Sequence, residues 1–450
     1  MASISAAIRH VKDSGETWIS EAIADEACAA AKHRWRRRVL TPVVTLRLFV
    51  LQVLWGNIAC RAVTHLSMLS FTPQAYCKAR ASLPAEVYGQ VAARLIDDAR
   101  QRVADFGRWK GHRVMLIDGT GLSMPDEKAL QKCFGQPGRQ KPGCGFPVMH
   151  VLWVFDAATG LIIDFIEGPC HTHDMAHAAY LHASMRDGDV AVADCAFASY
   201  AHLALLLEGN LHGVFRMHQR QIVDFTPRRL PRDRRPKGQR KGAPTSRWIR
   251  SLGELDQLVE YVKPTTRPKW MTQQAYDALP PTIVVRELRY DIARDGFRTQ
   301  TVTLVTTLVD AQKYTKEELT ELYRTRWDVE TNLCHLKQTM RMDVLRSKTV
   351  QGVRKELWMY VIVYNQVRLF MLDAAARQNV SPDRISFIDA LDALRHRGPP
   401  AAATVVIVVN PYRPGRHEPR VIKRGKDRYT RMTKPREILR KALGITRVAS

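Results

Sequence analysis

Two short apolar segments that each end in an aspartate most limit the folds available to this chain. Residues 113–118 (RVMLID) and 189–194 (DVAVAD) are rich in β-forming residues and too short for typical helices, so each predicts a buried strand. Residues 146–156 and 160–168 form a hairpin signal, which predicts two further strands. Residues 177–185 predict a helix, and the apolar run 212–218 predicts a fifth strand. This order predicts an α/β fold with a mixed sheet.

Changes in composition indicate how the rest of the chain is organised. Residues before about 105 lack strand alternation and predict helices, whereas 219–250 are rich in Pro, Gly and Arg, which is typical of an exposed loop. Strand-like runs return at 282–292 and 297–308, and an apolar helix is expected near 353–377. We therefore expect a helical N-terminal region at 1–105 and a core in two parts, 106–218 and 311–400. A β-rich basic insertion at 219–310 separates the two parts, and a basic tail follows at 401–450.

The charge of the chain predicts a polyanionic partner. Lys and Arg number 69 against 44 Asp and Glu, which gives a formal net charge of +25. Nucleic acid and an anionic membrane both fit such a charge. However, the apolar run at 48–60 is shorter than a membrane span, and Asn365 and Arg368 interrupt the run at 357–373. No secretory pattern opens the chain, so we expect a cytoplasmic protein with no membrane partner.

The eight cysteines do not predict disulfides or a zinc site. They are scattered without a C-x-x-C pair, and a cytosolic setting keeps such thiols reduced. The segment CHTHDMAH at 170–177 gathers potential ligands but lacks the usual spacing of a tetrahedral set. We interpret it as a polar loop that opens a helix.

The segment 321–340 (ELYRTRWDVETNLCHLKQTM) reads as a helix with an unusual polar face. At about 100° per residue, four of its side chains fall within roughly 60° of one another, namely Tyr323, Arg326, Glu330 and Lys337. They adjoin an apolar stripe at helical spacing. An ion pair at a core margin explains Glu330 and one cation, but not the phenol or the second cation.

Three acids then suggest a chemistry. Asp118 and Asp194 end core strands, where side chains line the functional crevice of open α/β sheets, and Glu330 lies on the helix. Singly, such residues are often turn formers or solvated. Together they are suited to hold two Mg²⁺ ions about 3.5–4 Å apart for in-line phosphoryl displacement. Cations beside a metal carboxylate are expected where a phosphate backbone runs along the helix.

These residues also resemble a known family. The four polar positions match Y-x2-R-x3-E-x6-K, the signature of the DDE transposases of the insertion-sequence-four family. Four further segments are similar to the family. Residues 117–126 resemble its first-aspartate segment and 143–160 the hairpin after it. Residues 188–197 resemble its second-aspartate segment and 345–368 the helix after the signature. The resemblance covers most of 113–373. It departs after the second aspartate, where relatives often carry Arg and this chain has Cys195.

The resemblance implies an RNase H-like core, a β-rich insertion between the second aspartate and the glutamate, and an N-terminal region that binds DNA. It implies that Asp118, Asp194 and Glu330 hold two Mg²⁺ ions, for which Mn²⁺ substitutes. The resemblance also implies contacts to DNA. Tyr323, Arg326 and Lys337 are expected to contact phosphates, and Trp327 is expected to stack on a displaced nucleotide. Core packing explains Trp327 equally well, and Trp270 is a weaker candidate for the same contact.

The implied function is DNA transposition. Such an enzyme cuts at the inverted-repeat ends of its own element and joins them to target DNA, and relatives form a hairpin on the way. The implied assembly is a homodimer in a synaptic complex, associated with the nucleoid. Two alternatives stay open, namely a nuclease or resolvase that does not join strands, and a non-catalytic DNA-binding protein on the same fold. The Arg-rich segment 228–250 and the tail are expected to contact phosphates.

Overall fold

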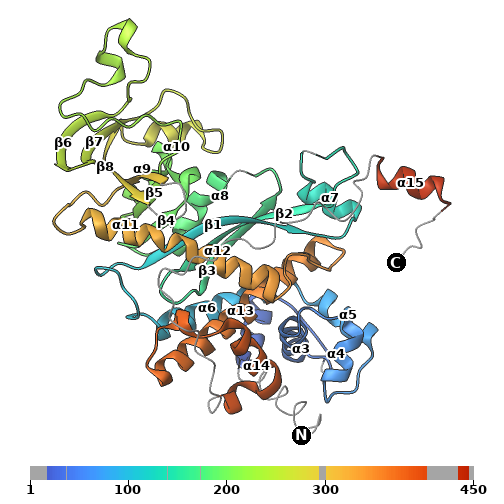
Figure 1. The fold of residues 1–450 in the computed structure, drawn as a ribbon. Coiled ribbons are helices and arrows are strands. Elements are labelled where there is room, and N and C mark those ends of the chain that lie inside the picture. Colours follow the sequence, from blue (N-terminus) through green and yellow to red (C-terminus); the bar gives the residue numbers. More distant parts are fainter. Residues whose placement is uncertain are drawn as a thin grey trace, which may run out of the picture.

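The computed structural model describes residues 18–36, 38–138, 140–172, 174–292, 300–402 and 434–444. Its centre is one nine-stranded mixed sheet with helices against both faces (Figure 1). The predicted α/β class is therefore confirmed. Most of the basic tail expected at 401–450 lies outside the described residues, as do residues 1–17.

The first half of the sheet contains the five strands expected from the sequence. Its order is β3-β2-β1-β4-β5, in which β1, β2 and β3 are antiparallel while β4 and β5 run parallel to β1. The bounds are β1 Val114–Ser123, β2 Val148–Asp156, β3 Ile162–Pro169, β4 Val190–Ala193 and β5 His212–Arg216. This order and these directions confirm the RNase H-like core.

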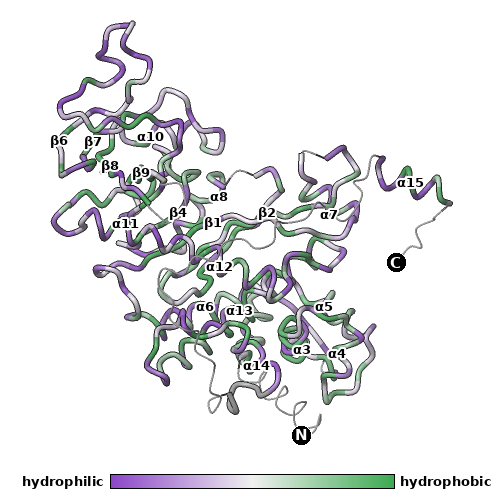
Figure 2. Tube along the Cα trace, viewed as in Figure 1, coloured by the Kyte–Doolittle hydropathy of each residue, from purple (hydrophilic) through white to green (hydrophobic). Residues whose placement is uncertain are grey.

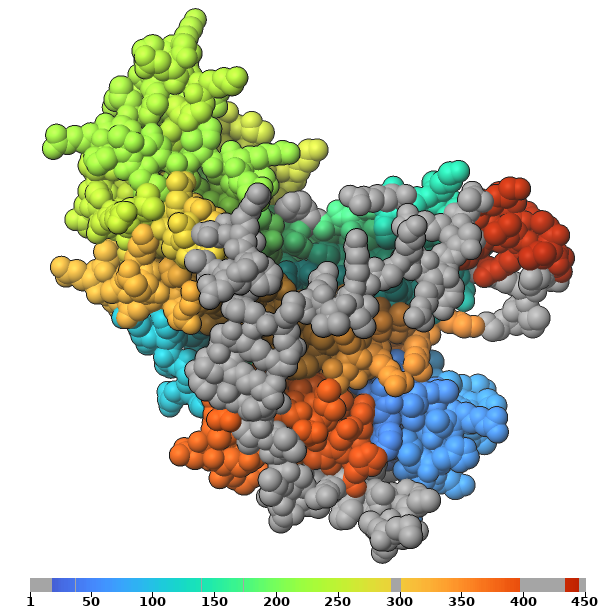
Figure 3. All heavy atoms as spheres, in the orientation of Figure 1, coloured from blue at the N-terminus to red at the C-terminus, as the bar shows by residue number. Residues whose placement is uncertain are grey.

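The strands of the expected insertion continue the same sheet. β9 pairs antiparallel with β5, and β8, β7 and β6 follow in that order. Their bounds are β6 Arg247–Gly253, β7 Asp256–Val262, β8 Thr282–Ile292 and β9 Gln300–Thr306. The insertion projects as a lobe in Figure 3 because its strands extend one edge of the core sheet. The domain boundaries at 218 and 310 stay predictions.

The helices divide between the two faces of the sheet. Successive side chains of β1 point to opposite faces of the sheet. Val114 and Leu116 pack in the hydrophobic cluster that contains α6 and α13. Met115 and Ile117 pack in the cluster that contains α8 and α9. The helix bounds are α2 Glu21–Ala30, α3 Pro42–Leu54, α4 Cys60–Leu66, α5 Pro73–Ser82, α6 Ala85–Arg102, α7 Lys128–Phe134, α8 Asp174–Leu181, α9 Tyr200–Glu208, α10 Gln273–Ala278, α11 Lys316–Arg324, α12 Arg326–Cys334, α13 Val350–Gln378, α14 Phe387–Ala402 and α15 Arg436–Ala442.

Helix α13 is the long buried helix of the structure. Figure 2 shows hydrophobic colour along much of it and along the core strands. Its polar residue Asn365 is buried because its side chain accepts from the N–H of Ile162 and donates to the carbonyl of Ile162, both at 2.8 Å. Asn365 thereby fastens α13 to β3, which explains a polar residue inside an apolar run. Within the described ranges, no helix combines the length and apolarity that crossing a membrane requires.

The predicted continuous helix over 321–340 is wrong in one respect. Helix α11 ends at Arg324, α12 begins at Arg326, and a π-helix follows at His335–Thr339. At the junction, the hydroxyl of Thr325 donates to the carbonyl of Leu322 at 2.7 Å. The wider turn of a π-helix shifts every later side chain around the axis. Lys337 therefore does not keep the angular position that uniform helical spacing predicts.

A buried arginine pairs with an aspartate inside the insertion and also bonds to the segment before α11. Arg286 is 1% exposed, and its Nε donates to Oδ1 of Asp256 at 2.8 Å while its Nη1 donates to the carbonyl of Tyr314 at 2.6 Å. Breaking a buried pair leaves an uncompensated charge, which costs about 3–5 kcal/mol. We expect Arg286→Leu to lower the free energy of unfolding by that amount in urea denaturation.

The control for this prediction is an exposed pair, Arg94 with Asp98. Arg94→Leu should cost less than about 1 kcal/mol, because solvent screens such a pair. The double variant Arg286→Leu/Asp256→Leu should recover part of the loss. A single variant at Arg286 that is as stable as Arg94→Leu would contradict the importance of the buried pair.

Candidate active site

The two predicted aspartates lie close together at neighbouring parallel strands, β1 and β4. Asp118 does not end its strand as predicted, because pairing with β2 continues β1 to Ser123. β1 and β4 are paired in register up to Leu116 and Val192. Asp118 follows two residues later within β1, and Asp194 follows two residues later, directly after the end of β4 at Ala193. Oδ1 of Asp194 accepts the N–H of Ala196 at 2.8 Å, and Oδ1 of Asp118 accepts the N–H of Gly119 at 2.9 Å. The Oδ2 atom of each carboxylate accepts no hydrogen bond from the described part of the chain and is left for a ligand.

The environment of Asp118 disfavours its charged form. Burial raises the pKa of this carboxyl to about 6, and the negative charge of Asp194 acts in the same direction. The N–H of Gly119 and the positive charge of Arg326 partly oppose the shift. A cation bound between the two aspartates would relieve this burial and repulsion, which is the electrostatic property expected of a metal-binding pair.

The glutamate of the signature lies on the neighbouring helix but is paired elsewhere. Helix α12 packs against β1, and Oε1 of Glu330 accepts from Nη2 of Arg326 at 3.1 Å. The side chain of Arg326 is 13% exposed and that of Glu330 is 49% exposed. Among the residues that the structure describes, no three His, Cys, Asp or Glu side chains form a group able to hold a metal ion. The structure therefore brings Asp118 and Asp194 together without Glu330.

Lys337 anchors the π-helix to the end of β1. Its Nζ donates to Oγ1 of Thr120 at 2.9 Å and to the carbonyl of Gly121 at 3.1 Å. These acceptors follow Asp118 on the same strand. The cation predicted to contact a phosphate thus holds the backbone beside the first aspartate.

The aromatic residues of the signature region differ in exposure. Tyr323 is buried in the main core cluster, and this burial raises the pKa of its phenol. Trp327 is 55% exposed with the guanidinium of Arg326 at 4.5 Å from its ring, so core packing does not explain it. Trp270 instead packs, partly buried, against the core cluster around α8 and α9, which makes it a poorer stacking candidate.

Sequence reasoning missed two features beside the aspartates. Arg216 ends β5, and its positive charge acts on the thiol of Cys195 and on the phenol of Tyr323. Its position depends on the pairing of β5 with β4, which no local pattern reports. It places a guanidinium next to the position where relatives often carry Arg.

The second missed feature is a partly buried contact beside Gly119 of β1. Nε2 of His150 and Oδ1 of Asp174 lie 2.6 Å apart, and a Cβ on Gly119 would meet that Oδ1 at 2.5 Å. A side chain after Asp118 would therefore require Asp174 or His150 to shift. The segment 170–177 offered a signal, since Asp174 belongs to it, and its interpretation as a loop opening a helix agrees with α8. His173 lies outside the described residues.

Comparison with known proteins assigns the family. Residues 109–366, more than half of the chain, match the transposase DDE domain family, and the chain belongs to that family. Over 322 residues it is 25% identical to transposase InsG for insertion sequence element IS4 of Escherichia coli (strain K12). That alignment covers 71% of this chain and 65% of the relative. The resemblance to the insertion-sequence-four family is thereby confirmed.

A solved structure was also found to be similar. The cryo-EM structure of the piggyBac transposase synaptic complex with hairpin DNA matches with a TM-score of 0.44 and 12% sequence identity. The match covers 86% of this chain and 79% of that chain.

The raised pKa of Asp118 predicts a stability effect. Because its folded pKa is above that of an unfolded aspartate, the ionised side chain destabilises the fold at pH 7, and this penalty disappears as the pH falls through about 6 towards 4. We expect Asp118→Asn to raise the free energy of unfolding in metal-free buffer at pH 7 by about 1–3 kcal/mol. The gain should shrink below pH 5 in thermal unfolding.

The exposed Asp105 provides the control. Asp105→Asn should leave stability unchanged to within about 0.5 kcal/mol at both pH values. A loss of stability in Asp118→Asn at pH 7 would show that the carboxylate is not held in an unfavourable environment.

The anchoring role of Lys337 is tested by removing its charge. Lys337→Met cannot donate to Thr120 or Gly121, and we expect a loss of about 1–2 kcal/mol in the free energy of unfolding. Hydrogen exchange of the amides near the end of β1 should accelerate. Lys132→Met, at an exposed position of α7, should change neither quantity. Equal exchange in the two variants would rule out the anchoring role.

Proposed function

We propose that this protein is a DNA transposase that cuts at the inverted-repeat ends of its own insertion sequence and joins those ends to target DNA. The observation that carries the proposal is the pair of neighbouring carboxylates, one on β1 and one directly after β4, with the signature helix α12 packed against β1. Family membership supports the same activity. A hairpin intermediate belongs to the proposal as an expectation from relatives.

The donor set fits divalent cations such as Mg²⁺. Asp118 and Asp194 each keep one carboxylate oxygen free of hydrogen bonds from the described residues, and Mg²⁺ prefers few carboxylates together with water and phosphate oxygens. We propose that these two residues and Glu330 hold two Mg²⁺ ions, for which Mn²⁺ substitutes. When bound, the ions activate the attacking oxygen and stabilise the leaving oxygen of the phosphodiester.

Completion of this site requires Glu330 to leave its partner. Arg326 now supplies the positive charge near Asp118 and binds Glu330 directly. A DNA phosphate is the natural competitor, because a guanidinium binds phosphate as readily as carboxylate. We propose that Arg326 turns to the DNA backbone and frees Glu330 for the metal site. Trp327, exposed beside Arg326, is then placed to stack on a displaced base, a contact worth about 1–3 kcal/mol.

Basic surfaces away from the carboxylates support DNA as the partner. A cavity of about 760 Å³ in the N-terminal region is lined by an exposed tryptophan with several cations, namely Trp35 with Arg34, Arg36, Arg38 and Lys78. The Arg-rich segment before β6, drawn partly purple as hydrophilic in Figure 2, adds further exposed cations. Two ends must be joined in one event, so we propose that a homodimer holds them in a synaptic complex.

The proposal is tested with a plasmid that carries the gene and its native flanking DNA, incubated with the purified protein and Mg²⁺. We expect paired breaks at inverted repeats, followed by joined products. Glu330→Gln should reduce cleavage by at least about 10³-fold, as expected for the loss of a metal-site carboxylate. The matched control is Glu321→Gln, since Glu321 also pairs with an arginine of the same segment, Arg324, at 2.9 Å. This variant should cleave normally.

Other outcomes separate the alternatives. Breaks at the ends without joined products would indicate a nuclease or resolvase. Tight binding of the ends without cleavage in Mg²⁺ or Mn²⁺ would indicate a non-catalytic DNA-binding protein. Cleavage that survives Glu330→Gln would place the active site elsewhere.

A further inference from the structure

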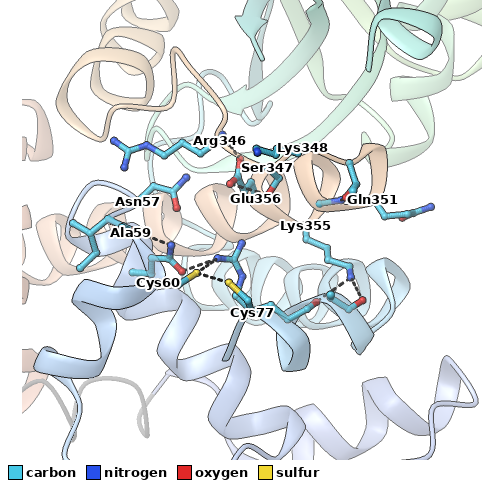
Figure 4. A pocket seen from close by; sticks show the side chains of 16 residues that line it. Asn57, Ala59, Cys60, Cys77, Arg346, Ser347, Lys348, Gln351, Lys355 and Glu356 are labelled. Atoms are coloured by element: carbon cyan, nitrogen blue, oxygen red, sulfur yellow. Dashed lines mark hydrogen bonds between the residues drawn. The ribbon is translucent and has the colours of Figure 1, made fainter. Parts of the chain in front are cut away.

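Two cysteines face each other where the N-terminal helices meet the core. The Sγ atoms of Cys60 on α4 and Cys77 on α5 lie 3.1 Å apart, and both thiols are free. Cys77 is exposed and Cys60 is partly exposed, so small reagents reach them. Figure 4 shows the two sulfur atoms side by side at the edge of a pocket. A shift of about 1 Å would bring them to the S–S bond length of about 2.05 Å.

Hydrogen bonds from the core fix helix α5, which carries Cys77. The pocket, of about 550 Å³, lies between α4, α5 and the start of α13. Lys355 of α13 donates to the carbonyls of Arg80 and Ala81 at 3.0 and 2.9 Å, which fastens the end of α5 to the core. Nη1 of Arg80 donates to the amide oxygen of Gln52 on α3 at 2.8 Å. Helix α5, and Cys77 with it, is therefore well fixed.

Helix α4 is held more weakly. Of its seven residues, Val63 is the one that is buried. It packs in a small cluster with Leu48 and Tyr76, separate from the two large core clusters. Cys60 packs at the edge of this cluster, with its Sγ 3.1 Å from Sγ of Cys77 and 3.8 Å from Nη1 of Arg80. A disulfide would therefore add a covalent link between α4 and α5.

We propose that Cys60 and Cys77 form a redox-modification site, a dithiol that closes to a reversible disulfide and locks α4 onto α5. The oxidant is a small disulfide of the glutathione class. One protein thiolate attacks the oxidant, forming a mixed disulfide and releasing one glutathione. The second protein thiolate then attacks the protein sulfur of that mixed disulfide and releases a second glutathione. Two protein thiols are oxidised, one glutathione disulfide is reduced, and the two protons leave on the glutathione thiols.

The thiolate content of the pair controls how fast it closes. Partial burial raises the pKa of the Cys77 thiol to about 11, and its hydrogen bond and charge interaction with Cys60 act in the same direction. The positive charge of Arg80 acts against this shift. Since the thiolate is the attacking species, closure should quicken as the pH rises above 7. The modification does not depend on the proposed transposase activity.

The test uses the full-length protein with glutathione disulfide. After reaction, free thiols are blocked, and the unreduced protein is digested for mass spectrometry. We expect a linked Cys60–Cys77 peptide pair, reversed by dithiothreitol and absent from Cys60→Ser and Cys77→Ser. Cys334→Ser, which removes an exposed cysteine outside the pair, is the matched control and should keep the link. Closure should be at least about tenfold faster in the folded protein than in urea, because the fold holds the sulfurs together.

A second readout tests the locking. Hydrogen exchange of the amides of α4 should slow when the disulfide forms and recover on reduction. Glutathione attached singly to several cysteines without a Cys60–Cys77 link would overturn the proposal, as would equal rates of closure in the folded and urea-unfolded chains. A link that leaves exchange in α4 unchanged would overturn the locking.

Discussion

The parallel pairing of β1 with β4 is the constraint on which the candidate active site depends. It places Asp118 and Asp194 side by side although 76 positions of sequence separate them. The fold keeps these two like charges together, with Asp118 half-buried, at a cost that shows in the raised pKa of Asp118. The surrounding helices make that arrangement rigid: α13 is fastened to β3 through Asn365, and the π-helix is fastened to β1 through Lys337. A strained pair of carboxylates on a rigid sheet is a common property of functional sites.

The nine-stranded sheet also connects the basic insertion to the core. Because β9 pairs with β5, the strand that ends in Arg216, the insertion continues the same hydrogen-bonded network as the carboxylates. The buried pair of Arg286 and Asp256 then links β8 and β7, and the bond from Arg286 to Tyr314 reaches the segment that leads into α11. The insertion is therefore positioned by the core from two sides. This arrangement gives a physical reason why the basic insertion and the signature helix would keep a fixed relation.

Much of the core and the identity of the two aspartates follow from local sequence, whereas the contacts among them do not. β1 and β4 were predictable because short apolar runs of β-forming residues have few alternatives, and the signature residues stood out by spacing. The π-helix was not predictable, because regular helical periodicity assumes uniform turns, and so the bonds of Lys337 to β1 were missed. Arg216 and the continuation of the sheet through the insertion depend on pairing between distant strands. The pairing of Glu330 with Arg326 is a choice between two acceptable partners, and spacing alone does not decide it.

The central claim is that Asp118, Asp194 and Glu330 form one metal site, and iron-directed cleavage tests it most directly. Fe²⁺ takes the place of Mg²⁺, and ascorbate with peroxide then cuts the protein backbone next to the bound metal. The account predicts cuts near residues 118 and 194, suppressed by excess Mg²⁺ and by Asp194→Asn, with a further cut near residue 330 when the DNA ends are bound. Cuts at other positions, or cuts near 118 and 194 that persist in Asp194→Asn, would contradict it.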